Sequence, residues 1–220
     1  MALILNIETT TTNCSVSLSK KGETLVLRED YNTKFSHAES LHVFINKVVE
    51  LAEIKFFEID AIAVSKGPGS YTGLRIGVSA AKGFCYALDK PLISVSTLQS
   101  LSQQVNVDEG FIVPMLDARR MEIYSAIFSA DHNQVRDIQA QILDENSFLD
   151  YLNKSKVYFI GSGVEKSKTI IQHENAIFIE NKLPSANEMG KLAYQKYLNN
   201  DFENVAYFEP FYLKDFIHLG

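Results

Sequence analysis

The chain has 220 residues, of which 46% are hydrophobic and 22% are charged. This composition is that of a globular protein with a sizeable core, either in one large domain or in two lobes of about a hundred residues each. The formal net charge of −6 argues against a protein that grips nucleic acid unaided, because phosphate binding relies on clustered lysine and arginine.

Cysteine content and hydropathy indicate where the protein works. Cys14 and Cys85 are the two cysteines, and without a CxxC pair they predict neither a disulfide framework nor a zinc knuckle. The N-terminal segment lacks the pattern of a signal peptide, and no run approaches the roughly 18 apolar residues that would span a bilayer. We therefore expect a cytoplasmic protein with no membrane association.

The first half of the chain alternates strand and helix patterns. Hydrophobic periodicity predicts strands at 3–7, 14–18 and 23–28, a helix at 36–54, a strand at 60–65, a helix at 72–88, a strand at 91–96 and a short helix at 97–105. Ser36 and Glu39 form a predicted capping box for the first helix, and Thr97 is the predicted cap of the last.

The same order begins again after Gly110. Strands are predicted at 111–116, 121–129 and 134–143, a helix at 144–153, a strand at 156–160, a helix at 164–172, a strand at 176–179 and a helix that Ser185 and Glu188 open as a second capping box and that ends at Leu198. The repeated order predicts an α/β protein of two similar lobes, 1–106 and 107–220. The last helix and tail have the further option of packing back on the first lobe.

Residues 65–77, SKGPGSYTGLRIG, hold four of the chain's glycines between a predicted strand and a predicted helix. A glycine turn that leads into a helix N-terminus can bind a phosphate group. The spacing, however, matches neither the dinucleotide fingerprint nor a Walker loop, so a structural turn is the stronger interpretation.

The helix after this turn has a face of small residues. Gly73, Gly77 and Ala81 recur every four positions and so lie above one another on one side of the helix. Glycine costs up to about 1 kcal/mol in a helix interior, which indicates that close packing compensates. Packing on helix 36–54 and packing on another protein both remain open.

The remaining chemical candidates are few. His37 and His42 are five residues apart, about 140° around a helix, so they cannot both face one metal ion. Glu8 and Asp117 each follow a predicted strand, where α/β proteins place functional groups. Glu8 is the stronger acidic candidate, although a strand-end carboxylate bonded to the following threonine turn would explain it equally.

Several segments together carry a resemblance to a known family. They are LNIETT at 5–10, CSV at 14–16, HAESL at 37–41, residues 65–77, PMLDAR at 114–119 and PFYL at 210–213. With these segments the sequence resembles the bacterial TsaB (YeaZ) family of the ASKHA superfamily, although Glu8 stands where aspartate is common. The resemblance implies two lobes of duplicated RNase H-like topology, as in actin-like ATPases.

The resemblance also implies a function in making threonylcarbamoyladenosine at position 37 of tRNA. There TsaC makes threonylcarbamoyl-AMP, TsaD transfers the threonylcarbamoyl group, and TsaB-like proteins are the non-catalytic partner of TsaD, joined by the ATPase TsaE. It implies no cofactor of the chain's own, with ATP or ADP at the interface with TsaD. A homodimer is expected when TsaD is absent, and tRNA is expected to be reached only through the complex.

Two sets of site residues follow from these interpretations. The expected partner interface consists of Glu39, Leu41, Phe44, Ile45, Val48, Gly73, Leu74, Gly77 and Ala81. The expected nucleotide or anion contacts are Glu8, Thr9, Thr10, Ser70, Thr72, Arg75 and Asp117. No catalytic residue and no metal ligand is predicted. The alternatives are a stand-alone ATP-binding enzyme of the ASKHA type and a homodimeric binding module.

Overall fold

The computed structural model describes residues 2–31 and 37–214. The chain divides into two compact units, Met1–Ser100 with Pro184–Gly220, and Leu101–Leu183. The division falls a few residues before the predicted boundary at 106. The last helix and the tail belong to the first unit, which is the option that the sequence left open.

The first unit is built on a five-stranded sheet. Its elements are β1 (Leu3–Glu8), β2 (Cys14–Lys20), β3 (Glu23–Asp30), α1 (His37–Leu51), a 3₁₀ turn (Phe56–Glu58), β4 (Ala61–Gly67), α2 (Tyr71–Leu88), β5 (Leu92–Ser96) and α6 (Met189–Leu198). The strand order is β3-β2-β1-β4-β5, with β2 antiparallel to both neighbours and β1, β4 and β5 parallel.

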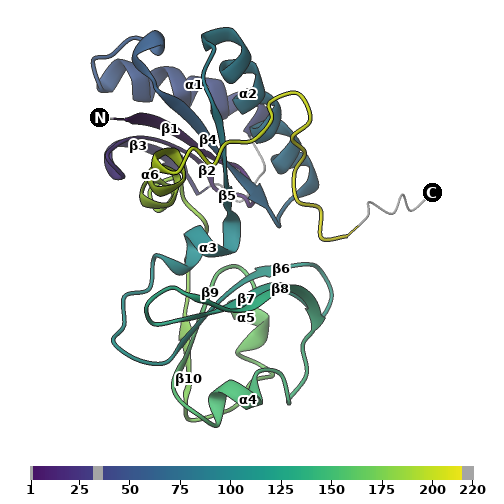
Figure 1. Cartoon of the computed structure of the whole chain (residues 1–220). Helices are drawn as coiled ribbons and strands as arrows, with labels where there is room; N and C mark the ends of the chain where they lie inside the picture. The colour runs from purple at the N-terminus through teal and green to yellow at the C-terminus, as the bar shows by residue number, and fades with distance from the viewer. Residues whose placement is uncertain (1, 32–36, 215–220) are drawn as a thin grey trace, which may run out of the picture. The chain divides into compact units, whose positions relative to one another are not determined.

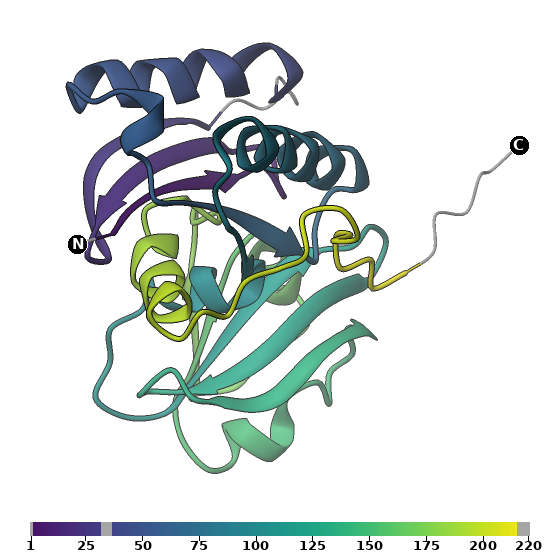
Figure 2. The same cartoon turned by 45° about the horizontal axis from the view of Figure 1, so that its top comes forward.

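Helices cover both faces of this sheet (Figure 1). On one face α1 and α2 pack over side chains such as Leu5 and Ile7. On the other face α6 packs over Ile4 and its neighbours. Figure 2 shows α1 and α2 together on the side of the sheet away from α6. Successive side chains of β1 point to opposite faces of the sheet, and helices cover both faces. Both sets of side chains are therefore buried, which explains the nearly continuous run of hydrophobic residues in this strand.

The second unit repeats the plan around its own core. It contains β6 (Phe111–Asp117), β7 (Glu122–Ser129), β8 (Gln134–Ile142), α4 (Leu149–Leu152), β9 (Val157–Ile160), α5 (Val164–Ser167) and β10 (Ala176–Ile179), while α3 (Thr97–Ser102) spans the division. The strand order is β10-β9-β6-β7-β8, and β6 pairs antiparallel with β7 and parallel with β9. Both sheets therefore place an antiparallel meander of three strands beside two parallel strands, which confirms the predicted duplicated topology.

Several local predictions were wrong. Ser185 does not cap α6, because its hydroxyl bonds to Glu29 and accepts from the Asn187 N–H, and the helix begins only at Met189. Thr97 bonds to Ser65 instead of capping α3. The helices predicted at 144–153 and 164–172 shrink to α4 and α5. Ser36, the predicted cap of α1, lies outside the described residues.

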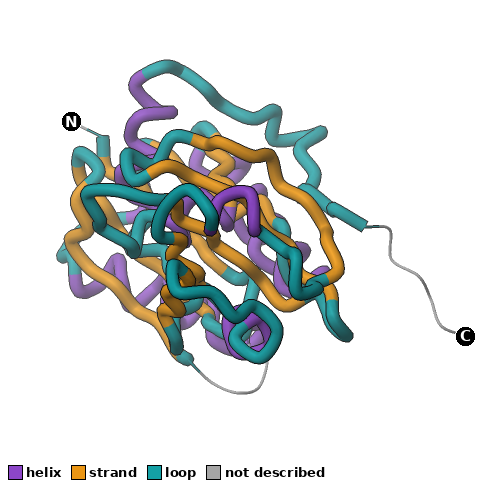
Figure 3. The backbone as a smooth tube through the Cα atoms, turned by 90° about the horizontal axis from the view of Figure 1, so that it is seen from below, coloured by secondary structure: helices purple, strands orange, loops and turns teal. Residues whose placement is uncertain are grey.

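The C-terminal segment of the first unit has almost no regular secondary structure (Figure 3). A bridge joins Glu203 to Leu92 of β5, and Lys82 of α2 donates hydrogen bonds to the carbonyls of Ala206 and Phe208. Farther along, the Phe211 N–H donates to the Lys66 carbonyl of β4. The segment thus binds along one side of the first unit as far as the start of α2.

Candidate functional site

The glycine-rich stretch forms the turn from β4 into α2. Ser70 caps the helix, and its hydroxyl accepts a hydrogen bond from the Gly73 N–H. Its own N–H donates to the Thr10 carbonyl at 2.7 Å. Because these amides already have partners within the chain, the observed geometry favours a structural turn over a phosphate site.

The glycines serve close approach between α2 and the turn after β1. An added Cβ at Gly73 would lie 2.0 Å from the Thr9 carbonyl oxygen, and one at Gly77 would lie 2.3 Å from Thr9 Oγ1. The same hydroxyl donates to the Gly73 carbonyl at 2.7 Å. The two glycines of the small face therefore pack on a turn of their own unit, and Ala81 belongs to the core that α1 also lines.

This packing corrects the predicted partner interface. Of its nine residues, Glu39 is exposed and Phe44 is half-buried. The others are buried within the first unit, namely Leu41, Ile45, Val48, Gly73, Leu74, Gly77 and Ala81. Most of the predicted positions therefore lie on the inward faces of α1 and α2, where no partner can reach them.

The outward faces of α1 and α2 form an open groove of about 660 Å³. Its lining is mostly small and apolar: Ala38, His42, Arg75, Ile76, Ser79, Ala80, Gly83, Phe84 and Ala87. An added Cβ at Gly83 would meet no atom within 4 Å. Unlike Gly77, this glycine is therefore not required by packing within the chain, and its lack of a side chain leaves the groove open. Tyr86, 88% exposed, follows on the same helix. The sequence contains a signal for this groove in the small residues Ser79, Ala80 and Gly83. The four-residue repeat of Gly73, Gly77 and Ala81 does not include them.

Glu8 lies completely buried at the end of β1. Its Oε1 accepts hydrogen bonds from the Thr10 N–H at 2.6 Å and from the Thr10 hydroxyl at 2.5 Å. Burial raises the pKa of this carboxyl, and the hydrogen bonds act in the opposite direction. Thr9 and Thr10 are buried too. This arrangement matches the strand-end alternative for Glu8 and leaves none of the three open to a ligand from solution.

Arg75, another expected anion contact, lies on the surface at the edge of the groove. Its guanidinium stacks 4.1 Å from the centre of the Tyr71 ring, and its Nε donates to the Tyr212 hydroxyl at 3.4 Å. Thr72 is also exposed, one turn earlier on α2. Arg75 therefore contributes to the same outward face as the groove.

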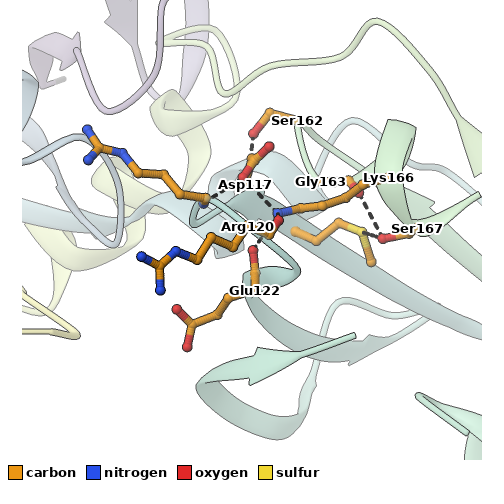
Figure 4. A network of polar contacts seen from close by, with 9 residues as sticks. Asp117, Arg120, Glu122, Ser162, Gly163, Lys166 and Ser167 are labelled. Atoms are coloured by element: carbon orange, nitrogen blue, oxygen red, sulfur yellow. Dashed lines mark hydrogen bonds and ion pairs between the residues drawn. The ribbon is translucent and has the colours of Figure 1, made fainter. Parts of the chain in front are cut away.

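Asp117, at the end of β6, is tied into a network within the second unit (Figure 4). Lys166 of α5 places its Nζ 2.7 Å from Asp117 Oδ1, and it also donates to the carbonyls of Arg120 and Glu122 at 2.9 and 2.6 Å. The Arg119 N–H donates to the same carboxylate oxygen, and the Asp117 N–H donates to the Ser162 hydroxyl oxygen at 3.0 Å. Lys166 was not found from the sequence, because 49 residues separate it from Asp117.

The two helix histidines point into different surroundings. His37 is buried and its Nε2 donates to the Thr11 carbonyl at 2.7 Å, while burial lowers its pKa. His42 faces Phe84 across the groove. Within 2–31 and 37–214, no three histidine, cysteine or acidic side chains gather as a metal site would require. In the same residues no helix has the length and apolar character to cross a membrane.

A family model described as "TsaD: tRNA N6-adenosine threonylcarbamoyltransferase" matches residues 32–217. The chain belongs to this family. The tRNA threonylcarbamoyladenosine biosynthesis protein TsaB of Haemophilus influenzae is 26% identical, over 96% of this chain and 93% of the relative. TsaB of Bacillus subtilis is 29% identical, over 77% of this chain and 75% of the relative. Within the family, the chain thus resembles TsaB proteins over most of its length.

A transferase is also related, over a shorter stretch. The tRNA N6-adenosine threonylcarbamoyltransferase of Staphylococcus aureus is 33% identical, over 52% of this chain and 38% of the enzyme. Among solved structures, YeaZ from Pseudomonas aeruginosa gives a TM-score of 0.82 at 24% identity and covers 97% of this chain and 100% of its own. Ethanolamine utilization protein EutJ from Carboxydothermus hydrogenoformans gives 0.53 at 9% identity, over 88% and 89%. These structures agree with the two-lobe α/β fold.

Proposed function

We propose that this chain is the non-catalytic TsaB-type subunit of tRNA threonylcarbamoyladenosine formation. It binds and activates the transferase TsaD, and the ATPase TsaE joins the pair. The observation that carries the proposal is the open apolar groove on α1 and α2 in a chain whose relatives are named for this biosynthesis. Such a surface in a protein of this composition is typical of a protein–protein interface.

The relationship between this chain and the transferase supports the groove as the site of contact. Because a TsaD-type enzyme is 33% identical to part of this chain, the two proteins can present similar helices to each other. Related surfaces pair well about an approximate two-fold axis, as identical surfaces do in homodimers. The groove would then be filled by helices of the transferase, and Arg75 would lie at the edge of the contact.

The surroundings of the two candidate acids support the non-catalytic part of the proposal. Glu8 is enclosed and bonded to Thr10, and the carboxylate of Asp117 is held by Lys166. Neither carboxylate stands ready to bind a metal–nucleotide complex. We therefore propose that the chain carries no nucleotide of its own, that any ATP or ADP is held where it meets TsaD, and that the complex works in the cytoplasm.

The groove provides a direct test. Gly83→Leu should place a side chain in the groove without a clash at its Cβ, because nothing lies within 4 Å of an added Cβ. We expect the affinity for TsaD to fall at least about tenfold, equivalent to about 1.4 kcal/mol, in isothermal titration calorimetry. The variant should be at least as stable as the wild type in thermal unfolding, because leucine has a higher helix propensity than glycine.

Gln195→Leu is the matched control, since Gln195 is exposed on α6, on the opposite face of the sheet. Its affinity for TsaD should stay at the wild-type value. Full affinity in the Gly83→Leu variant would refute the groove as the interface. Gly77→Leu, which the sequence had suggested for this purpose, is unsuitable because it would clash with Thr9.

A further inference from the structure

We propose that the tip of the β6–β7 hairpin, formed by Arg119 and Arg120, binds phosphate groups of the RNA backbone. The inference rests on the proposed function and deepens it, because it gives the second unit a contact with tRNA inside the assembled complex. It concerns a surface that belongs to the second unit alone and that the partner groove does not include.

The backbone at the tip is unusual for arginine. Arg119 has φ of 70° and Arg120 has φ of 50°, so two consecutive residues with long side chains adopt the left-handed region. Glycine or asparagine would adopt this region more readily. Two arginines at such positions indicate that the function of their side chains outweighs the cost in backbone conformational energy.

Lys166 holds the tip in place from beneath. Its ammonium group donates to the Asp117 carboxylate and to the carbonyls of Arg120 and Glu122, and its side chain is only 16% exposed. The Lys166 charge is matched by Asp117 at 2.7 Å, so this acid is already paired beside the two arginines. These contacts of Lys166 hold the hairpin in place. Because Lys166 and Asp117 neutralise each other, the positive charge of the tip comes from Arg119 and Arg120.

Both arginines are exposed, and within the described residues neither guanidinium has an ion pair or hydrogen bond. Figure 4 shows the Arg120 side chain pointing away from Asp117 and Lys166, with the Glu122 carboxylate extending on the same side of the hairpin. The tip thus carries two positive charges and one nearby negative charge. Guanidinium groups suit phosphate oxygens because their planar N–H donors can bind in pairs.

A phosphate backbone fits this tip better than a folded acidic protein. The chain as a whole is acidic, with a net charge of −6, so a polyanion would be repelled by most of its surface and would touch it at a local point. Two adjacent guanidinium groups on a narrow turn can contact phosphates of one strand, whereas a protein partner would need a larger complementary surface.

The test uses the full chain assembled with TsaD and an unmodified tRNA transcript. Arg119→Asn/Arg120→Gly removes both guanidinium groups while relaxing the left-handed turn, so the variant should be at least as stable as the wild type. We expect tRNA affinity to fall, and the slope of log K against log salt to become shallower by about 1 to 2, because two phosphate contacts are lost. Filter binding between 50 and 300 mM salt measures both.

Three further variants sharpen the result. Arg119→Lys/Arg120→Lys keeps the charge and should retain most of the salt slope, Glu122→Gln should bind tRNA more tightly, and Arg28→Ala on β3 should change nothing. Assembly with TsaD is measured first in every variant, so a failure of the proposed function appears as lost assembly. Unchanged tRNA affinity and slope in Arg119→Asn/Arg120→Gly would overturn the inference. Weaker assembly with unchanged tRNA binding would also overturn it, by assigning the tip to a protein partner.

Discussion

Single residues decide what the end of β1 can do. Glu8 stands where a functional acid would be placed, but its side chain is wholly buried and its Oε2 has no hydrogen-bond partner among the described residues. Burial of an incompletely bonded carboxylate disfavours the charged form. Glu8 therefore acts as a structural acid that joins β1 to the turn at Thr10.

This environment makes the stability of the protein depend on pH. The pKa of Glu8 is raised above its ordinary value of 4.5, chiefly by burial, so the folded chain holds this proton more tightly than the unfolded chain does. The stability contributed by the protonated form is full below about pH 4.5 and is lost as the pH rises toward the folded pKa.

Glu8→Gln should abolish this loss, because the amide keeps an oxygen that can accept from Thr10 and carries no titrating proton. Relative to the wild type, the variant should gain stability with rising pH, by up to about 1.4 kcal/mol per unit while Glu8 titrates. Urea unfolding at several pH values from 4 to 8 measures the difference, with Glu23→Gln, an exposed change on β3, as the control. Parallel curves for Glu8→Gln and the wild type would contradict this account.

At the scale of elements, α2 has two kinds of glycine. Gly77 faces the Thr9 turn, and Gly83 faces open space. Both lie in the same helix and both lower its intrinsic propensity, and the sequence separates them only by placing Gly77 on the period-four face. The contact with the Thr9 turn, which Gly77 makes and Gly83 does not, shows which of the two serves the fold.

The same substitution should therefore have opposite effects at the two positions. Gly83→Ala should stabilise the protein by up to about 1 kcal/mol through helix propensity alone. Gly77→Ala should destabilise it by about 1 to 3 kcal/mol, because a methyl group must enter the space of Thr9 Oγ1. Chemical denaturation of both variants measures this. Stabilisation by Gly77→Ala would show that the Thr9 turn yields at little cost.

The elements also show what sequence patterns can predict. Alternating and continuous apolar runs predicted the strands of both sheets, because side-chain direction along a strand depends on the strand itself. Caps and interfaces depend on distant residues. Ser185 bonds to Glu29, 156 positions away, and Thr9 meets Gly73, 64 positions away. The periodicity of α2 showed a small face but could not show its neighbour.

At the scale of the whole molecule, the open groove on α1 and α2 has a consequence in the absence of TsaD. An exposed apolar face tends to pair with a second copy, since a two-fold contact lets each copy cover the other's groove. Each chain also carries a net charge of −6, so two copies repel each other. Association is then a balance between apolar burial and electrostatic repulsion.

This balance predicts a homodimer that salt strengthens. Raising the ionic strength from about 0.02 to 0.2 M shortens the Debye length to less than about 10 Å and screens the repulsion, while burial of the groove is little affected. Sedimentation equilibrium of the isolated chain should show tighter dimerisation at the higher salt concentration, and Gly83→Leu should remain monomeric at both. Under the proposed function, added TsaD should compete with the homodimer, because the two proposals assign both partners to the same groove. A dimer that persists in Gly83→Leu, or one that salt dissociates, would place self-association on a different and charged surface.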